Sequence, residues 1–203
     1  MRINRSDDYF ANSTWKGTWK KDGGMLINQG IHLIDLFTWL MGNIKEVYGD
    51  ITRNRKNKEI EDVAAGIVTF SNQAKGLIEA NTITKPANLG YQLNIFAEKG
   101  TISIGGKGLQ EIIHCYVEQH PELESELQSN ATDEHLLMYK DFIEAIQKNR
   151  PPLVSAKESR KALETIFALY HSALKKQPVP LPLSAFSTEE MITWSKKGDE
   201  YND

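Results

Sequence analysis

The stretch that decides the fold is GGMLINQGIHLIDLFTWLMG, residues 23–42. At 3.6 residues per turn its apolar side chains cover most of the circumference, so the spacing predicts one long buried helix. A narrow seam of Asn28, His32, Asp35 and Trp39 follows the remaining side, at positions i, i+4, i+7 and i+11. Gly42 ends the helix where a left-handed cap residue belongs.

The polar seam has two main interpretations, because an unpaired buried polar group costs roughly 1–3 kcal/mol. In the first, His32 is a core histidine that is hydrogen-bonded to Asp35, and spacing alone slightly favours this structural role. In the second, His32 transfers a proton to or from an alcohol, Asp35 orients its ring, and Asn28 binds a substrate hydroxyl. A metal site at His32 and Asp35 is weaker, since only two ligand types lie in line.

Composition limits the class of protein. The chain has 203 residues, 40% of them hydrophobic, which is enough for one sizeable core. A net charge of −3 and a sequence pI of about 6.0 argue against nucleic-acid or membrane-surface binding. The single cysteine, Cys115, excludes an intrachain disulfide, and residues 1–13 lack the apolar core of a secretory signal. We therefore expect a soluble cytoplasmic protein.

After Gly42 the pattern changes to short runs that are rich in Val, Ile, Thr and Tyr. They predict strands near 44–53, 61–70, 75–84, 90–97, 100–104 and 109–117. The acidic stretch 118–134 is predicted to be a solvated loop. A helix is expected over about 132–148, with Leu136, Met138, Phe142, Ile143 and Ile146 facing inward. A second helix opens with a capping box at Ser155 and runs to Pro178.

The predicted fold class is α+β. We expect an open, largely antiparallel sheet, the long motif helix, and two C-terminal helices packed on one sheet face. Strand 61–70 is apolar on both faces, so the uncovered sheet face is expected to join subunits into a dimer or tetramer. The tail 184–203 has two short apolar segments and is expected either to wrap back on the domain or a partner or to be partly disordered.

Several motifs together resemble the C-terminal domain of the Gfo/Idh/MocA oxidoreductases. They are Trp15-Lys16-Gly17-Thr18-Trp19, the pair Gly23-Gly24, Asn28-Gln29-Gly30-Ile31-His32 with Asp35, Glu61-Asp62, Phe70-Ser71-Asn72 with Gly76, Ile95–Thr101, Asp141–Ile146, and Arg150-Pro151-Pro152. Many members carry Asp four residues before the histidine, where this chain has Asn28. The Asn-Gln form is more similar to the subgroup of nucleotide-sugar 3-dehydrogenases.

The resemblance implies hydride transfer between a sugar or nucleotide-sugar carbon and NAD or NADP. His32 would be the acid/base, Asn28 and Gln29 would bind substrate hydroxyls or the nicotinamide ribose, and Asp35 would support the site together with Gly23 and Gly24. In the lead-in, Arg5 is a candidate for an anionic substrate group, although a surface arginine is the more common role. Tyr9 and Trp15 could wall a sugar pocket, although core or interface packing is more common for aromatics.

The resemblance covers only the second half of the family's usual chain. The sequence contains no G-x-G-x-x-G turn between a strand and a helix, and no Glu-Lys-Pro element with the family's active-site lysine. We therefore expect residues 1–21 to lead in from a missing nucleotide-binding domain and residues 22–183 to form the substrate and oligomerisation domain. The chain alone should be inactive. The alternative is a non-catalytic sugar-binding or assembly module.

Overall fold

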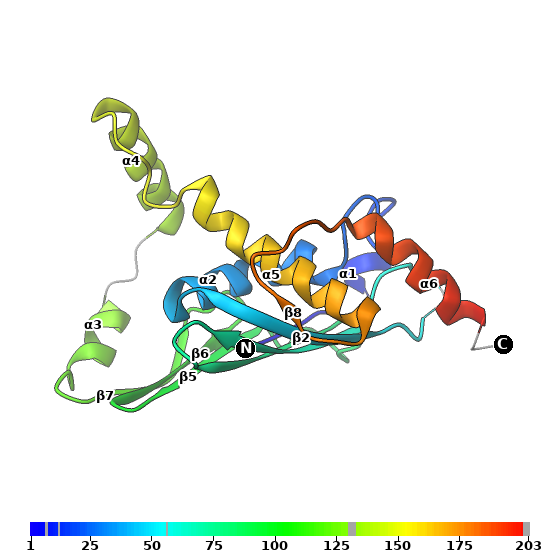
Figure 1. Cartoon of the computed structure of the whole chain (residues 1–203). Helices are drawn as coiled ribbons and strands as arrows, with labels where there is room; N and C mark the ends of the chain where they lie inside the picture. Colours follow the sequence, from blue (N-terminus) through cyan, green and yellow to red (C-terminus); the bar gives the residue numbers. More distant parts are fainter. Residues whose placement is uncertain (7, 12, 56, 130–132, 201–203) are drawn as a thin grey trace.

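A computed structural model describes residues 1–6, 8–11, 13–55, 57–129 and 133–200 of the chain. One open sheet forms the centre of the molecule, and the longest helix, α5, lies above it together with α2 (Figure 1). Within the described ranges, no helix combines the length and the apolar character needed to cross a membrane.

The sheet has eight strands in the order β7-β6-β5-β1-β4-β3-β2-β8. Every neighbouring pair is antiparallel except β1 and β4, which are parallel, so the predicted α+β class with a largely antiparallel sheet is confirmed. The strands are β1 Arg2–Asn4, β2 Ile44–Thr52, β3 Val63–Phe70, β4 Lys75–Asn81, β5 Tyr91–Ala97, β6 Gly100–Gly106, β7 Glu111–Val117 and β8 Val179–Pro180.

Six of these strands agree with the predicted ranges to within a few residues. The other two, β1 and β8, are three and two residues long, too short to show an alternating pattern. Strand β1 nevertheless lies near the centre of the sheet, between β4 and β5, and its Ile3 is fully buried. The start of the chain is thus part of the sheet that carries the motif helix.

The helical segments cover mainly one face of the sheet. Helices α2 and α5 lie on the same side of it, and α5 packs against β2 (Figure 1). The segments are α1 Asp8–Ala11, the π-helical turn η1 Leu26–Gly30, α2 Ile31–Met41, α3 Leu123–Ser129, α4 Glu134–Gln147, α5 Ala156–Lys175, the 3₁₀ turn η2 Thr188–Glu190 and α6 Met191–Glu200.

The core lies between α2, α5 and the covered sheet face. From α2, Leu33, Ile34 and Phe37 are buried, and the ring of Phe37 meets that of Phe70 edge-on with centroids 5.1 Å apart. Two predicted helix ends are confirmed. Gly42 ends α2 with a φ of 91° and donates its N–H to the carbonyl of Thr38, while Ser155 caps α5 by accepting from the N–H of Glu158.

Three expectations about the second half of the chain are wrong. The stretch predicted as a solvated loop contains α3, which lies against β7, although residues 130–132 fall outside the described part. Helix α4 forms as predicted but projects away from the sheet instead of packing on it (Figure 1). Its side chains predicted to face inward, Leu136, Met138, Phe142, Ile143 and Ile146, are exposed. Amphipathic spacing identifies the apolar side of a helix but not the molecule that covers it.

The predicted tail folds back on the domain. Residue Met191 at the start of α6 is fully buried, and the ring of Trp194 lies edge-on to the buried Trp19 with centroids 6.1 Å apart. Residues 201–203 lie outside the described part. The chain therefore joins its tail to the segment that precedes the motif helix.

Candidate functional site

The predicted motif helix is not one continuous α-helix. It opens with the π-helical turn Leu26–Gly30 and continues as α2 from Ile31. Both Asn28 and Gln29 lie in this wider turn, one residue of which is inserted relative to α-helical spacing. Such π-turns occur often at functional sites, because the extra residue re-aims neighbouring side chains.

The start of the motif helix is fixed from behind by a buried carboxyl group. An oxygen of Glu61, Oε1, accepts from the backbone N–H of Leu26 at 3.2 Å and from the hydroxyl of Tyr170 at 2.7 Å. Its other oxygen, Oε2, is buried without a hydrogen-bond partner among the described residues. Burial raises the pKa of Glu61 to about 7, against the hydrogen bonds from Tyr170 and Leu26, which lower it.

Gly24 allows the side chains of Glu61 and Trp19 to pack closely against the backbone before the motif helix. Residue Gly24 has a φ of 101°, a region that side-chain-bearing residues rarely adopt. A Cβ there would lie 2.8 Å from Glu61 Oε2 and 2.9 Å from the ring of Trp19. Its neighbour Gly23 also has a positive φ, of 72°. The glycine pair is thus required by the local geometry, as support for the helix that carries the predicted site.

Four predicted site residues meet in one hydrogen-bonded cluster. The guanidinium of Arg5 donates through Nε to Gln29 Oε1 at 2.9 Å and through Nη2 to the hydroxyl of Tyr91 at 2.5 Å. On the other side, Gln29 Nε2 donates to the hydroxyl of Tyr9, which in turn donates to Asn28 Oδ1 at 2.6 Å. The lead-in, β5 and the motif helix are therefore joined at this point.

Most polar groups of the cluster are hydrogen-bonded within the protein, and one N–H donor has no partner among the described residues. Both ends of the Gln29 amide are bonded, and Arg5 is only 8% exposed and also donates to the carbonyl of Asn4. The oxygen of Asn28 accepts from Tyr9 and Gln29, whereas its Nδ2 has no acceptor among the described residues. Within the cluster, Asn28 is thus the amide that can donate to a ligand.

Aromatic rings flank this cluster. The ammonium of Lys16 lies 3.8 Å from the centroid of the Tyr9 ring and 5.7 Å from that of Trp15. The Trp15 side chain is itself exposed. The ammonium of Lys16 thus makes cation–π contacts with Tyr9 and Trp15, next to the Tyr9 hydroxyl that binds Asn28. The sequence pattern assigned no role to this cation.

The other part of the seam faces a groove between α2 and the start of α5. Residues His32, Asp35 and Trp39 line it from α2, and Val154 and Glu158 face them, around a volume of about 520 Å³. The His32 side chain is exposed and has no hydrogen bond within the described part of the chain, so the core-histidine interpretation is wrong. Burial raises the pKa of Asp35, the nearby His32 opposes this, and Glu158 adds to it.

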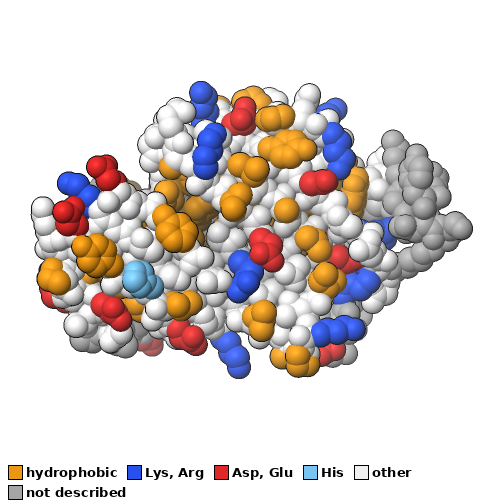
Figure 2. All heavy atoms as spheres, turned by 90° about the horizontal axis from the view of Figure 1, so that it is seen from below, with side chains coloured by type: hydrophobic (Ala, Val, Ile, Leu, Met, Phe, Trp, Pro, Cys, Tyr) orange, Lys and Arg blue, Asp and Glu red, His pale blue; other side chains and the backbone are white. Residues whose placement is uncertain are grey.

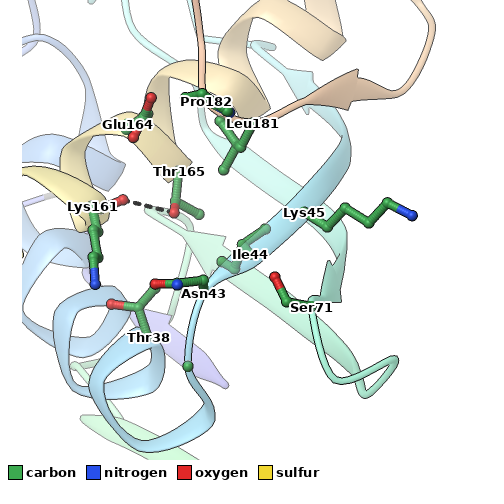
Figure 3. A pocket seen from close by; sticks show the side chains of 11 residues that line it. Thr38, Asn43, Ile44, Lys45, Ser71, Lys161, Glu164, Thr165, Leu181 and Pro182 are labelled. Carbon is green, nitrogen blue, oxygen red and sulfur yellow. Dashed lines mark hydrogen bonds between the residues drawn. The ribbon is translucent and has the colours of Figure 1, made fainter.

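A second hollow begins where this groove ends. It lies beyond the C-terminus of α2, has a volume of about 320 Å³, and shares Thr38 and Lys161 with the first (Figure 3). In Figure 3 the side chain of Lys161 points toward the end of α2, whereas that of Lys45 points away from the hollow. None of the residues predicted for the site lines it. The groove with His32 is therefore the better candidate site.

Three contributors to the site were missed from the sequence. Tyr91 looks like an ordinary strand residue, and Lys16 stands in the Trp15–Trp19 motif without a predicted role; nothing in their spacing places them beside Arg5 or Tyr9. Glu61 stands in one of the motifs that carry the family resemblance, but its role depends on Tyr170 from the other end of the chain. Only the tertiary fold brings these groups together.

The fold and this motif helix define an α+β domain of the kind that accompanies dinucleotide-dependent oxidoreductases. Residues 1–181 match the model of the oxidoreductase family C-terminal α/β domain, Gfo/Idh/MocA. The chain belongs to this family, whose C-terminal domain it carries. A search of curated proteins found no match.

Solved structures agree with this assignment. The WlbA dehydrogenase from Chromobacterium violaceum, in complex with NADH and UDP-GlcNAcA, is 30% identical over 91% of this chain, with a TM-score of 0.77. The WlbA dehydrogenase from Bordetella pertussis, with the same ligands, is 29% identical over 90% of this chain, also at 0.77. The chain spans 55% of the length of each. Levoglucosan dehydrogenase with NADH and levoglucosan shares the fold, at 17% identity over 89% of this chain and 58% of its own, with a TM-score of 0.69.

Proposed function

We propose that the chain is the substrate-binding and self-association domain of an NAD- or NADP-dependent dehydrogenase that acts on a nucleotide sugar. The observation that carries the proposal is on the motif helix. There the imidazole of His32 is exposed and lies four residues after Asn28, and neither this ring nor the Nδ2 of Asn28 has a hydrogen-bond partner among the described residues. The identity with two dehydrogenases that bind NADH and UDP-GlcNAcA supports the same substrate class.

In this proposal His32 is the proton-transferring group. During oxidation its neutral ring takes the proton of the reacting hydroxyl, and Asp35 on the next turn stabilises the imidazolium that forms. The amide Nδ2 of Asn28 donates to a neighbouring substrate hydroxyl or to the nicotinamide ribose. The buried cluster of Arg5, Gln29 and Tyr9 holds Asn28 in place rather than touching substrate itself.

The cofactor fits this arrangement only in part. NAD or NADP supplies the acceptor for the hydride when it is bound. The motif helix offers the cofactor the Asn28 amide as a hydrogen-bond donor. The glycine-rich stretch Gly105–Gly108 is no phosphate-binding loop, because it lies at the end of β6 and in the turn that leads to another strand instead of a helix. We therefore propose that a separate domain binds most of the dinucleotide and that the isolated chain does not turn over. With NAD or NADP and a panel of UDP-sugars, it should give no rise in nicotinamide absorbance.

A binding experiment tests the site directly. In an NMR titration with UDP-GlcNAcA, with and without NADH, the amide signals of residues 28–35 and of Tyr9 should shift. The variant Asn28→Ala should weaken the shifts, while Asn72→Ala, in a distant turn, should not. Shifts confined to other regions would overturn the proposed site. A non-catalytic module instead predicts that His32→Ala leaves the activity of a full-length parent unchanged.

The uncovered sheet face is the proposed self-association surface. Across β2, β3 and β4 the neighbouring residues Tyr48, Ile67 and Leu77 form one exposed apolar row. Figure 2 views this face and shows hydrophobic side chains interspersed with charged ones. An exposed apolar row between charged residues is typical of a subunit interface. The variant Leu77→Asp should lower the molar mass measured by light scattering.

A further inference from the structure

Lys16 lies on a turn whose backbone is fixed by hydrogen bonds. The hydroxyl of Ser13 accepts from the N–H of Lys16 at 3.2 Å. The next two N–H groups, of Gly17 and Thr18, donate to the carboxylate of Asp22 at 2.7 and 3.1 Å. The backbone of Lys16 is therefore held in one place, and the acidic residue of its own segment binds backbone donors instead of the ammonium.

The ammonium of Lys16 has an aromatic contact but no acidic partner. It lies 3.8 Å from the centroid of the Tyr9 ring, a distance at which a cation and a ring face attract each other. Among the described residues no carboxylate pairs with it. The ring thus holds the charge in place without neutralising it, and the N–H donors of the ammonium are available to a ligand.

A second cation without a counter-ion lies beside the same ring. The guanidinium carbon of Arg5 is 5.9 Å from the Tyr9 centroid. Within the described part of the chain its N–H groups donate to two neutral side chains and a backbone carbonyl, and to no carboxylate. Because a buried charge without a counter-ion is unfavourable, Arg5 and Lys16 together favour an anion beside Tyr9.

The opposite sign of charge prevails farther along the motif helix. Asp35 and Glu158 line the groove beyond His32. The ammonium of Lys161, the one lysine among the described residues that line this groove, is already bound by Glu158 Oε2 at 2.6 Å. An anionic group is therefore repelled from that end of the helix and attracted to its start, beside Asn28.

Lys16 lies across one aromatic ring from the amide that is proposed to bind substrate. The hydroxyl of Tyr9 donates to Asn28 Oδ1 at 2.6 Å, and the ammonium of Lys16 lies over the same ring. An aromatic ring and a pyranose ring are similar in size. A sugar with one hydroxyl at Asn28 is therefore long enough to bring a charged group on its far side to Lys16.

We propose that Lys16 binds the oxyanion that a nucleotide sugar carries beside its reacting ring, and that the buried charge of Arg5 strengthens this contact without touching the substrate. This role rests on the proposed function, since it takes the substrate to be held at Asn28. The oxyanion is either the carboxylate of a sugar acid or the diphosphate that links sugar and nucleoside. In both cases Lys16 selects charged sugars over neutral ones.

Titration calorimetry of the whole chain with UDP-GlcNAcA tests the contact. The variant Lys16→Gln removes the charge and should raise the Kd about tenfold, because hydrogen bonds to charged groups are among the stronger ones. Lys16→Arg keeps the charge and should retain most of the affinity. The control Lys99→Gln removes an equal charge from the exposed turn at the far end of β5 and should leave the Kd within about twofold. A wild-type Kd for Lys16→Gln would overturn the proposal.

A second ligand identifies the oxyanion. UDP-GlcNAc retains the diphosphate but lacks the carboxylate. An effect of Lys16→Gln that persists with UDP-GlcNAc assigns the diphosphate, whereas one that vanishes assigns the carboxylate. In either case added salt should weaken the binding of UDP-GlcNAcA to the wild type more than to Lys16→Gln. Equal salt dependence would show that Lys16 acts through the structure of its turn, which overturns the proposal.

The outcome also separates this role from the proposed function. A loss of affinity in Asn28→Ala without one in Lys16→Gln would remove only the role of Lys16. If UDP-GlcNAcA does not bind the whole chain, the proposed function fails, and inorganic pyrophosphate still tests the anion site by NMR. Pyrophosphate should shift the amide signals of Trp15 and Lys16 in the wild type and not in Lys16→Gln. Wild-type signals that do not shift would overturn the anion site.

Discussion

The carboxyl of Glu61 and the hydroxyl of Tyr170, 109 positions apart in the chain, are joined by a 2.7 Å hydrogen bond directly behind the first turn of the motif helix. The same Glu61 oxygen accepts from the N–H of Leu26 at 3.2 Å. A negative charge at a helix start is favourable, whereas burial of that charge is not. The position of the candidate site therefore depends on an ionisable group that lies wholly inside the protein.

Folding stability should fall as pH rises through neutrality because of Glu61. Its folded-state pKa of about 7 lies above the ordinary value of 4.5, so the folded chain binds the proton more tightly than the unfolded chain. This contribution is fully present below pH 4.5 and is lost as pH rises through about 7. The variant Glu61→Gln removes it, so the stability difference between the two proteins should change by roughly 3 kcal/mol from pH 4.5 to pH 8.

Urea denaturation at several pH values measures this difference. Every other ionisable group is common to the two proteins, so its contribution cancels when the variant is subtracted from the wild type. Parallel curves for the two proteins would show that Glu61 does not titrate in this range.

Gly24→Ala should be far more damaging than Gly42→Ala. Both glycines have positive φ values, 101° and 91°, and each alanine would incur about 1–3 kcal/mol of backbone strain. At Gly42 a Cβ would meet nothing within 4 Å, whereas at Gly24 it would press on Glu61 and Trp19. We expect Gly24→Ala to cost at least about 2 kcal/mol more than Gly42→Ala by urea denaturation. Equal losses would mean that the crowding behind the motif helix relaxes freely.

The sequence pattern predicted most of the sheet because each longer strand has one covered face. Alternation of apolar and polar residues in strands such as β2 reports that burial directly, and Gly42 and Ser155 mark helix ends by local chemistry. The direction of α4 could not be predicted, because neither its periodicity nor the local bonds from Arg150 and Leu153 to Asp141 show which way the helix leaves the sheet. Periodicity shows that a face needs cover, but it does not show which molecule provides the cover.

The part of the candidate site that lies on one helix could be predicted from the sequence, whereas the part that combines separate elements could not. The seam on the motif helix follows from spacing alone, and its exposed end agrees with a ligand-facing role. The split of the seam at the π-turn is not visible in the sequence, since an inserted residue leaves no compositional signal. Nor could spacing show that Arg5 is buried against Gln29 and Tyr91, because these three residues come from separate elements.

Replacing the proposed acid/base should leave the fold intact. The His32 side chain is exposed and unbonded within the described part of the chain, so His32→Ala should change the free energy of unfolding by no more than about 0.5 kcal/mol. The buried Phe37, on the same helix, should cost about 3–5 kcal/mol when changed to Ala. Urea denaturation of both variants checks this contrast. A large loss for His32→Ala would mean that the ring has a structural role.

The bond between Tyr9 and Asn28 should be measurable as a coupling energy. The Tyr9 hydroxyl donates to Asn28 Oδ1 at 2.6 Å, and Gln29 Nε2 contacts both groups, so the three form one unit. In a double-mutant cycle, Tyr9→Phe and Asn28→Ala should couple by about 0.5–1.5 kcal/mol in unfolding free energy.

A control cycle pairs Tyr9→Phe with Asn72→Ala. The amide of Asn72 meets the carbonyl of Met41, at the far end of the motif helix, which at 1.5 Å per residue lies roughly 20 Å from Asn28. Sites so far apart without shared partners should be additive to within about 0.5 kcal/mol. If the Tyr9–Asn28 cycle is equally additive, the lead-in does not hold the amide in place. The uncommitted Nδ2 of Asn28 would then lack the fixed direction that substrate binding by this helix requires.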